Sequence, residues 1–475
     1  MDFIAQIKKS NIKGNRINYT DVLPRMVVKF HDYLDLPYCG AKEISEFFLQ
    51  DHIIPWSCIL EVFPAIRINK LFTTPRPEDI MRLVDRAKNL DTGYQPPDFL
   101  SYFAISCPCE INTDDLLEII LKCENVELAY IASGASHPPS VQIDDNPLCK
   151  YQGYLNPAPN GINAKYAWNI NGGDGGVGVM FVDVEQGWLE NHEDIVLNTL
   201  PSTGFNYNIF QDHGAAVLGV IMMQDNATGG IGITPRVKGY VISQWRPDGS
   251  PNTADAIISS ACHLNFGDIL LLEAQTYEGG SVNKFWPIEI EDAIYNAIRL
   301  ATALGITVIE AAGNGNFNLK IGNDLDVLTI NDNKPLNPMS SGFKDSGAII
   351  VAAASSTVPH TRINYSNYGS RIDCYAWGED VVTAGCLPGS SGAAINQYTG
   401  KFGGTSSASA IIAGAAIAVQ SITEANYSFR LSAKQMRDIL SDESYGTQSA
   451  NGHSVDKIGM MPDLKKIIDN ALNFT

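Results

Sequence analysis

The sequence predicts an α/β protein in two parts: a large domain with a mostly parallel sheet and helices on both faces, and a smaller α+β domain before it. Three observations support this. After residue 150, apolar strand-like runs alternate with helical runs, which is typical of a parallel sheet covered on both faces. Before residue 140 the strands and helices are shorter. Apolar residues make up 45% of the 475 residues, enough for a large core and too many for a disordered chain.

The predicted domains span residues 1–140 and 156–475, with a linker at 141–155 that is rich in acidic and turn-forming residues. In the first domain, residues 26–30 and 59–63 fit short strands, and Pro64 ends the second. Residues 102–105 and 126–131 fit strands on either side of a helix that begins at Asn112. These three elements predict a small β-α-β unit.

The large domain contains five runs that predict buried strands, at residues 177–184, 237–243, 268–272, 306–312 and 348–354. Between two of them, residues 290–304 carry apolar side chains at helical spacing. Gly305 then predicts the end of that helix. This order of strands and helices predicts a doubly covered sheet.

Charge and composition limit the partners of the chain. Lys and Arg total 33 against 52 Asp and Glu, a net charge of −19, which disfavours nucleic acid and anionic membranes as partners. The longest apolar run, residues 410–419, is about half of what a membrane span needs. The first residues lack an apolar stretch of signal-peptide length, and nine scattered cysteines fit reduced thiols. We therefore expect a cytoplasmic protein, with export independent of a signal peptide left open.

Two residues lie where strands and helices meet. Asp183 ends an otherwise apolar strand, at the sheet edge where sites collect in parallel sheets. His213 begins an apolar helix, whose positive dipole end favours a neutral, proton-accepting imidazole. Each alone has a structural alternative, since a strand-end acid often caps a loop and a lone His is often structural.

Two further segments combine glycines with polar side chains. Ser406 stands at the entrance of an apolar helix rich in small residues, where backbone N–H groups could bind an oxyanion. Asn314 follows a predicted strand and offers an amide N–H₂ as a second oxyanion donor. The alternatives are a helix N-cap at Thr405, Ser406 or Ser407 and a simple turn at Gly313 and Gly315.

Taken in order, Asp183, His213, Asn314 and Ser406 resemble the subtilisin-like serine proteases (subtilases). Asp183 and His213 are 30 residues apart, and His213 and Ser406 are 193 apart. The flanking sequence is also similar to the motifs of this family in four segments: residues 192–195, 229–235, 311–314 and 404–406. The resemblance covers about residues 150–470. It implies a serine endopeptidase acting on protein or peptide substrates. Ser406 would be the nucleophile, His213 the general base and Asp183 its orienting acid. Asn314 would stand in the oxyanion hole.

The sequence departs from the family's usual pattern at Ala215 and Ala410, both small changes away from the proton path. Glu273 and Gln275 stand where the family lines the pocket for the residue before the scissile bond, which predicts a basic or polar preference there. The alternative is a Glu273 that points away and is paired elsewhere. No cofactor or metal is predicted. The acidic loop at residues 323–326, with Asp332, lacks the ligand spacing of a calcium site and fits a solvated turn.

The first 140 residues resemble the propeptides of this family only in their strand-helix-strand order and their position. The resemblance implies a domain that docks on the catalytic cleft and is released by cleavage in the linker. A recognition module that persists in the mature protein is the competing interpretation. Two other functions stay open: a catalytically inactive binding or regulatory protein on this fold, and an esterase or lipase. The second is disfavoured because no Gly-x-Ser-x-Gly segment surrounds Ser406.

Overall fold

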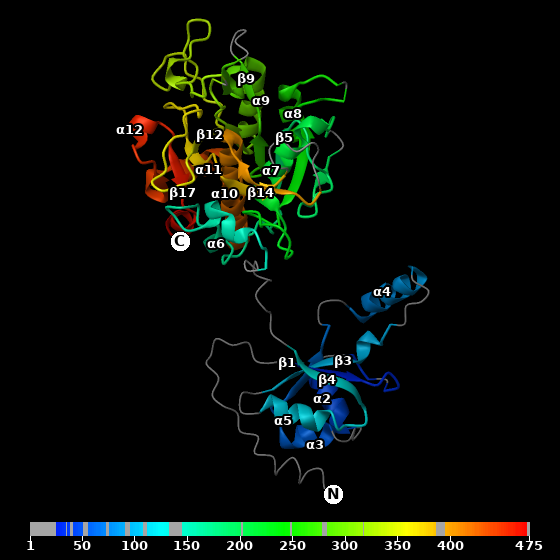
Figure 1. Ribbon diagram of the computed structural model, residues 1–475. Helices are drawn as coiled ribbons and strands as arrows, with labels where there is room; N and C mark the ends of the chain where they lie inside the picture. The colour runs from blue at the N-terminus through cyan, green and yellow to red at the C-terminus, as the bar shows by residue number, and fades with distance from the viewer. Residues whose placement is uncertain are drawn as a thin grey trace. The chain divides into compact units, whose positions relative to one another are not determined.

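The computed structural model divides the chain into two compact units, Met1–Pro138 and Pro139–Thr475 (Figure 1). The structure describes residues 25–34, 36–38, 41–50, 56–72, 76–90, 96–107, 112–132, 145–200, 203–247, 249–277, 283–316, 318–385 and 395–472. Each unit has a core of its own.

The first unit is a four-stranded antiparallel sheet with helices. Its strands are β1 (Arg25–Phe30), β2 (Arg67–Lys70), β3 (Tyr102–Ser106) and β4 (Val126–Ala132), in the order β2-β3-β1-β4. Its helices are α2 (Ala41–Gln50), α3 (Trp56–Val62), α4 (Pro77–Leu90) and α5 (Thr113–Ile120). Asn112 caps α5 by accepting the Asp114 backbone N–H through its side chain at 3.0 Å, as its position predicts.

Two expectations for this unit need correction. Residues 59–63, predicted as a strand, lie mostly in helix α3, where Trp56, Ile59 and Leu60 recur at helical spacing and are buried. A short apolar run does not distinguish a strand from a buried helix turn. The β3-α5-β4 unit exists, but β1 lies between its two strands and pairs antiparallel with both. The predictions that this unit docks on a catalytic cleft or is released from the chain stay predictions.

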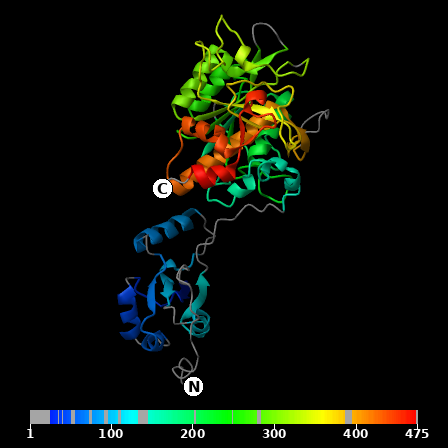
Figure 2. The same cartoon turned by 90° about the vertical axis from the view of Figure 1, so that its left-hand side faces the viewer.

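The second unit has a nine-stranded sheet in the order β16-β17-β13-β12-β11-β8-β5-β7-β6 (Figures 1 and 2). All neighbouring pairs are parallel except β16 (Gly446–Gln448) with β17 (Met460–Pro462). The five predicted strands are confirmed as β5 (Met180–Glu185), β7 (Lys238–Ser243), β8 (Ile269–Leu272), β11 (Thr307–Ala311) and β12 (Ile349–Ala354). The remaining strands of the sheet are β6 (Asn198–Thr199) and β13 (Cys374–Trp377).

Helices cover both faces of this sheet, so the predicted fold class is confirmed. Helices α7 (Gln211–Met222) and α10 (Gly404–Tyr427) pack together on one face, and α8 (Thr253–Ala261) and α9 (Asp292–Ala303) on the other. Successive strand residues point to opposite faces. Phe181 therefore packs with the α7 and α10 side, and Val182 and Val184 with the α8 and α9 side. This alternation decides the direction of every polar side chain at the strand ends.

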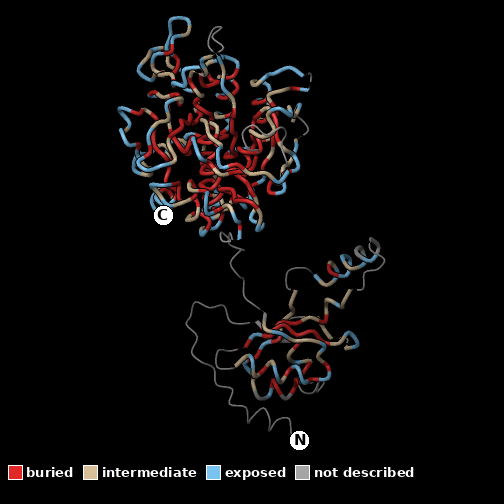
Figure 3. The backbone as a smooth tube through the Cα atoms, viewed as in Figure 1, coloured by how far each residue is buried: buried red, intermediate tan, exposed pale blue. Residues whose placement is uncertain are grey.

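The core of the second unit is centred on α10, where the buried backbone gathers in Figure 3. Small residues along α10 let it approach the sheet closely, and a Cβ on Gly414 would come within 2.7 Å of Ile233. Within the described residues, α10 is the helix whose length and apolar composition would suffice to cross a membrane, and 94% of that stretch is buried in the unit. We therefore describe it as the central helix of the core.

The predicted linker, 141–155, differs from the structure in its second half. Residues 149–151 and 153–155 form two short 3₁₀ helices within the second unit. Tyr154 and Leu155 are buried, and the Gln152 side chain donates to the Ile231 carbonyl at 2.9 Å. Residues 133–144, where the sequence predicts the start of the linker and possible release, lie outside the described residues.

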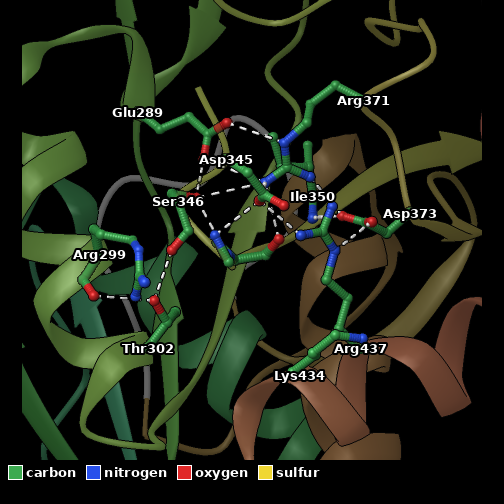
Figure 4. Close-up of polar contacts among 12 residues, drawn as sticks. Glu289, Arg299, Thr302, Asp345, Ser346, Ile350, Arg371, Asp373, Lys434 and Arg437 are labelled. Atoms are coloured by element: carbon green, nitrogen blue, oxygen red, sulfur yellow. Dashed lines mark hydrogen bonds and ion pairs between the residues drawn. The ribbon is translucent and has the colours of Figure 1, made fainter. Parts of the chain in front are cut away.

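A buried ionic network ties the middle of α11 (Ala433–Ser441) to the sheet (Figure 4). The Arg371 guanidinium is fully buried, and its nitrogens lie 3.2 Å from a Glu289 oxygen and 2.7 Å from an Asp373 oxygen. Arg437 reaches the other Asp373 oxygen and Asp345, both at 2.7 Å. Because a buried charge needs a partner, this network is a structural element whose loss should be costly.

Candidate active site

The site forms at the carboxyl ends of three neighbouring parallel strands, β5, β8 and β11. Val184 of β5 pairs with Leu272 of β8, so Glu185 and Glu273 follow at adjacent positions on neighbouring strands. By strand alternation both side chains share the α7 and α10 face with Phe181 and Leu271. The first turns of α7 and α10, which carry His213 and Ser406, lie on this same face.

Glu185 is the carboxylate that contacts the imidazole of His213, at Nδ1. Only 3% of the Glu185 side chain is exposed, against 38% for His213, which leaves the ring reachable from solvent. Phe402 packs edge-on against the ring, with centroids 5.6 Å apart. Thus one ring nitrogen is held by a buried carboxylate, an arrangement that fixes the tautomer of a general base.

The prediction that Asp183 orients His213 is wrong in this geometry. Asp183 is fully buried, and one of its oxygens accepts the Trp188 indole N–H at 2.7 Å. Burial raises the pKa of Asp183 well above its ordinary value, and the neighbouring Glu185 and Glu273 raise it further. Burial thus disfavours the charged form of Asp183, which lies two residues short of the strand end. Since the strand continues to Glu185 on the same face, the strand alternation and the sheet-edge position could have indicated Glu185 from the sequence.

The pKa of His213 lies high. Desolvation lowers it, but Glu185, Glu273 and Asp183 outweigh that effect and raise the pKa to about 9. Glu185, His213 and Glu273 each place one nitrogen or oxygen within 4.8 Å of the others. That spacing could suit a cation, but Glu185 already occupies Nδ1 of the imidazole, so we assign these groups to proton chemistry.

Ser406 lies in the first turn of α10, as predicted. The N-cap residue is Gly403, with no side-chain cap, so the alternative in which Thr405, Ser406 or Ser407 caps the helix does not hold. The Ser407 hydroxyl is buried and donates to the Trp377 carbonyl at 2.9 Å, away from the site. Gly404 has φ +91, a conformation that favours glycine, and this lets the chain turn into the helix. The hydroxyls of Thr405 and Ser407 thus bind other groups of the protein, and Ser406 is the hydroxyl of the first turn that we consider as the nucleophile.

Asn314 is held in place through its amide oxygen. Its Oδ1 accepts from the Thr405 backbone N–H at 2.9 Å and from the Thr405 hydroxyl at 3.0 Å. A Cβ on Gly404 would lie 3.4 Å from Asn314 Nδ2, so this donor borders the start of α10. The Gln275 side chain accepts the Asn314 backbone N–H at 3.0 Å. The sequence showed neither supporting contact, because Thr405 in α10 and Gln275 in strand β9 (Gln275–Tyr277) are distant from Asn314 along the chain.

The two predicted pocket residues have different surroundings. Gln275 is exposed and supports Asn314 as described. Glu273 is 5% exposed and accepts from the Ser409 hydroxyl at 2.6 Å, which favours the alternative that it is paired inside the protein. A separate cavity of about 510 Å³ borders Asn314 and Gly404 and is lined by charged residues that include Lys320, Glu379 and Asp380.

In the acidic loop, Lys457 supplies the positive charge. Its Nζ lies 2.8 Å from an Asp326 oxygen and 3.7 Å from Asp324. Asp326 also accepts from the backbone N–H and hydroxyl of Ser370. These contacts lower the pKa of Asp326 against the opposing effect of its burial. The loop is therefore an ion-paired turn around a lysine.

Comparison with known proteins found a family model, a relative and solved structures that are similar to this chain. The sequence model described as "Subtilase family" matches residues 190–460. Subtilisin DY of Bacillus licheniformis is 28% identical over 263 residues, 54% of this chain and 80% of that protein. Among solved structures, proteases from Pseudoalteromonas arctica PAMC 21717 share 20% identity at a TM-score of 0.48, covering 69% of this chain and 99% of theirs. The prenylagaramide maturation protease PagA shares 18% identity at a TM-score of 0.45, covering 64% and 97%.

Proposed function

Because the chain belongs to the subtilase family and so to the serine peptidases, we propose that it is an endopeptidase with a Glu185-His213-Ser406 triad. The observation that carries this proposal is the contact between Glu185 and His213 Nδ1, at the sheet edge where the first turn of α10 carries Ser406. Protein or peptide chains are the substrate class. The triad order along the chain is acid, base, nucleophile, as in this family.

In the proposed mechanism, Ser406 Oγ attacks the carbonyl carbon of the scissile bond. Its proton passes to His213 Nε2, the nitrogen that Glu185 leaves free. Glu185 stabilises the imidazolium that results. The imidazolium then gives its proton to the leaving amine, and an acyl-enzyme remains on Ser406. Water, deprotonated by the same imidazole, hydrolyses that ester and restores the serine.

The oxyanion of the tetrahedral intermediate would be bound by Asn314 Nδ2 and the Ser406 backbone N–H. The first turn of α10 supports this role, because its N–H groups have no partner within the helix and its dipole favours negative charge. Thr405 keeps the Asn314 oxygen occupied, so the amide nitrogen is available to the substrate. One such donor contributes about 3–4 kcal/mol to transition-state stabilisation.

Digestion of a peptide library, read by mass spectrometry, tests the proposal. Wild type should cut internal bonds, which is endopeptidase activity, and Ser406→Ala and His213→Ala should abolish cleavage. Ser407→Ala is the matched control, since its hydroxyl is bound to Trp377, and it should remain active. Cleavage by Ser406→Ala, or its loss only in Ser407→Ala, would contradict the assignment of the nucleophile. A folded wild type that cuts no peptide would instead favour the non-catalytic binding protein.

A further inference from the structure

Glu273 is a second carboxyl group at the active site, and the proposed mechanism does not use it. It follows β8 directly, and its neighbour across the sheet is Glu185. Its side chain is 5% exposed, so it belongs to the interior of the site. The backbone carbonyl of Glu273 accepts from the Gln244 side chain at 3.2 Å, which holds the strand end in place.

The two oxygens of Glu273 have different surroundings. Oε1 accepts from the Ser409 hydroxyl at 2.6 Å. Oε2 is buried and makes no hydrogen bond of good geometry with the described residues. A Glu273 oxygen, a His213 nitrogen and a Glu185 oxygen lie within 4.8 Å of one another. The Glu273 carboxyl is therefore a near neighbour of the imidazole.

The carboxyl groups that act on His213 come from the ends of two neighbouring strands. Asp183 and Glu185 belong to β5, and Glu273 follows β8. Helix α10 contributes the hydroxyls of Ser406 and Ser409 to this region, as its contacts with Glu273 show. The electrostatic effects that act most strongly on the imidazole all come from carboxyl groups, and all favour its charged form. Glu185 acts most strongly among them, and Glu273 follows.

We propose that Glu273 is a positioning residue that, with Glu185, holds His213 as an imidazolium in the free enzyme, so that His213 must lose this proton before it can serve as a base. The inference rests on the proposed function. An imidazolium has no lone pair with which to accept the Ser406 proton. Loss of the proton to solvent frees Nε2, and attack by Ser406 becomes possible.

The titration properties of the two groups agree with this role. The carboxylates raise the pKa of His213 to about 9 against its desolvation. Burial raises the pKa of Glu273 to about 8, although His213, Ser409 and Ser406 oppose the rise. Both groups therefore titrate at alkaline pH. Replacing a carboxyl by an amide removes a charge that stabilises the imidazolium, so the pKa of His213 should fall.

The pH dependence of kcat/KM in the full-length protein tests the inference. In wild type, the rising limb should have a midpoint near pH 9. In Glu273→Gln that midpoint should move about 1 lower on the pH scale, the low end of what a charge within 4–6 Å produces. Because Glu273 itself ionises near pH 8, the two profiles should differ most between about pH 8 and 9, where the wild-type carboxylate is charged and the amide is not. Glu273→Asp keeps the charge and should keep the alkaline limb.

Ser407→Ala is the matched control on α10, and its profile should coincide with that of wild type. An unchanged profile in Glu273→Gln would overturn the inference, because a merely structural Glu273 would alter the plateau and not the midpoint. If Glu273→Gln does not fold, the imidazole of His213 is titrated by NMR in Ser406→Ala. A pKa near 9 supports the inference, and one below about 7 overturns it. This titration needs no turnover, so an inactive wild type would refute the proposed function without deciding the role of Glu273.

Discussion

Glu185 and Asp183 can be distinguished by matched substitutions at the end of β5. Glu185→Gln keeps the size of the side chain but removes the negative charge at His213 Nδ1. An amide can also donate to Nδ1, which would hold the wrong tautomer. Asp183 is poorly suited to replace this charge, since burial raises its pKa well above the ordinary value and so disfavours its charged form. We therefore expect kcat to fall about 10⁴-fold, the loss seen when the orienting acid of such a triad is replaced by an amide.

That loss corresponds to about 5.4 kcal/mol of activation free energy. By contrast, Asp183→Asn replaces an acid whose charged form burial disfavours, and its side-chain oxygen can still accept the Trp188 indole N–H. We expect kcat of Asp183→Asn to stay within about tenfold of wild type, a change of about 1.4 kcal/mol. Both variants are compared with a chromogenic peptide at saturating concentration, and thermal melts confirm that they fold. Comparable activity in Glu185→Gln and wild type, with loss in Asp183→Asn, would show that Asp183 and not Glu185 orients the imidazole.

Three further predictions concern the support of the site and of the fold. Thr405→Val removes the hydroxyl that donates to Asn314 Oδ1, so kcat should fall about tenfold. Loss of the oxyanion donor itself costs more, about 10²–10³-fold. An unchanged kcat would contradict the role of Thr405 in orienting Asn314. Arg371→Met leaves Glu289 buried without its ion-pair partner (Figure 4), so urea denaturation should show a free energy of unfolding lower by about 3–5 kcal/mol. Lys434→Met removes an exposed ion pair and should change the free energy of unfolding by less than about 0.5 kcal/mol. Glu310 is buried on the α8 and α9 side of the sheet, and burial raises its pKa well above the ordinary value. Protonated Glu310 therefore contributes fully to the free energy of unfolding below about pH 4.5, and this contribution is lost as the pH rises toward the pKa of Glu310 in the folded protein. The free energy of unfolding of Glu310→Gln should therefore fall less than that of wild type between pH 5 and 9. An equal fall in both proteins would contradict the raised pKa of Glu310.

The sequence predicted the large domain well because its strands are buried on both faces. Runs such as residues 348–354 are apolar throughout, and such runs between helices indicate a parallel sheet. The small domain was predicted less well at α3, since its seven residues suit either a strand or two helix turns. The second half of the linker was missed because Tyr154 and Leu155 are buried by contacts that no local pattern shows.

At the site, the sequence indicated which elements converge but not which acid meets the imidazole. His213, Asn314 and Ser406 were identified from motifs at the ends of strands and the starts of helices. Asp183 was predicted because it is an acid at the apparent end of an apolar strand, but β5 continues to Glu185. The pairing of Glu273 with Ser409 depends on how β8 and α10 pack, so residue spacing could not reveal it.

Labelling with a fluorophosphonate probe, followed by peptide mapping, asks whether Ser406 is an activated nucleophile. We predict one covalent adduct, on Ser406, formed faster as His213 loses its proton and absent in Ser406→Ala. Modification of another serine, or a folded wild type that takes up no probe at any pH, would contradict the triad.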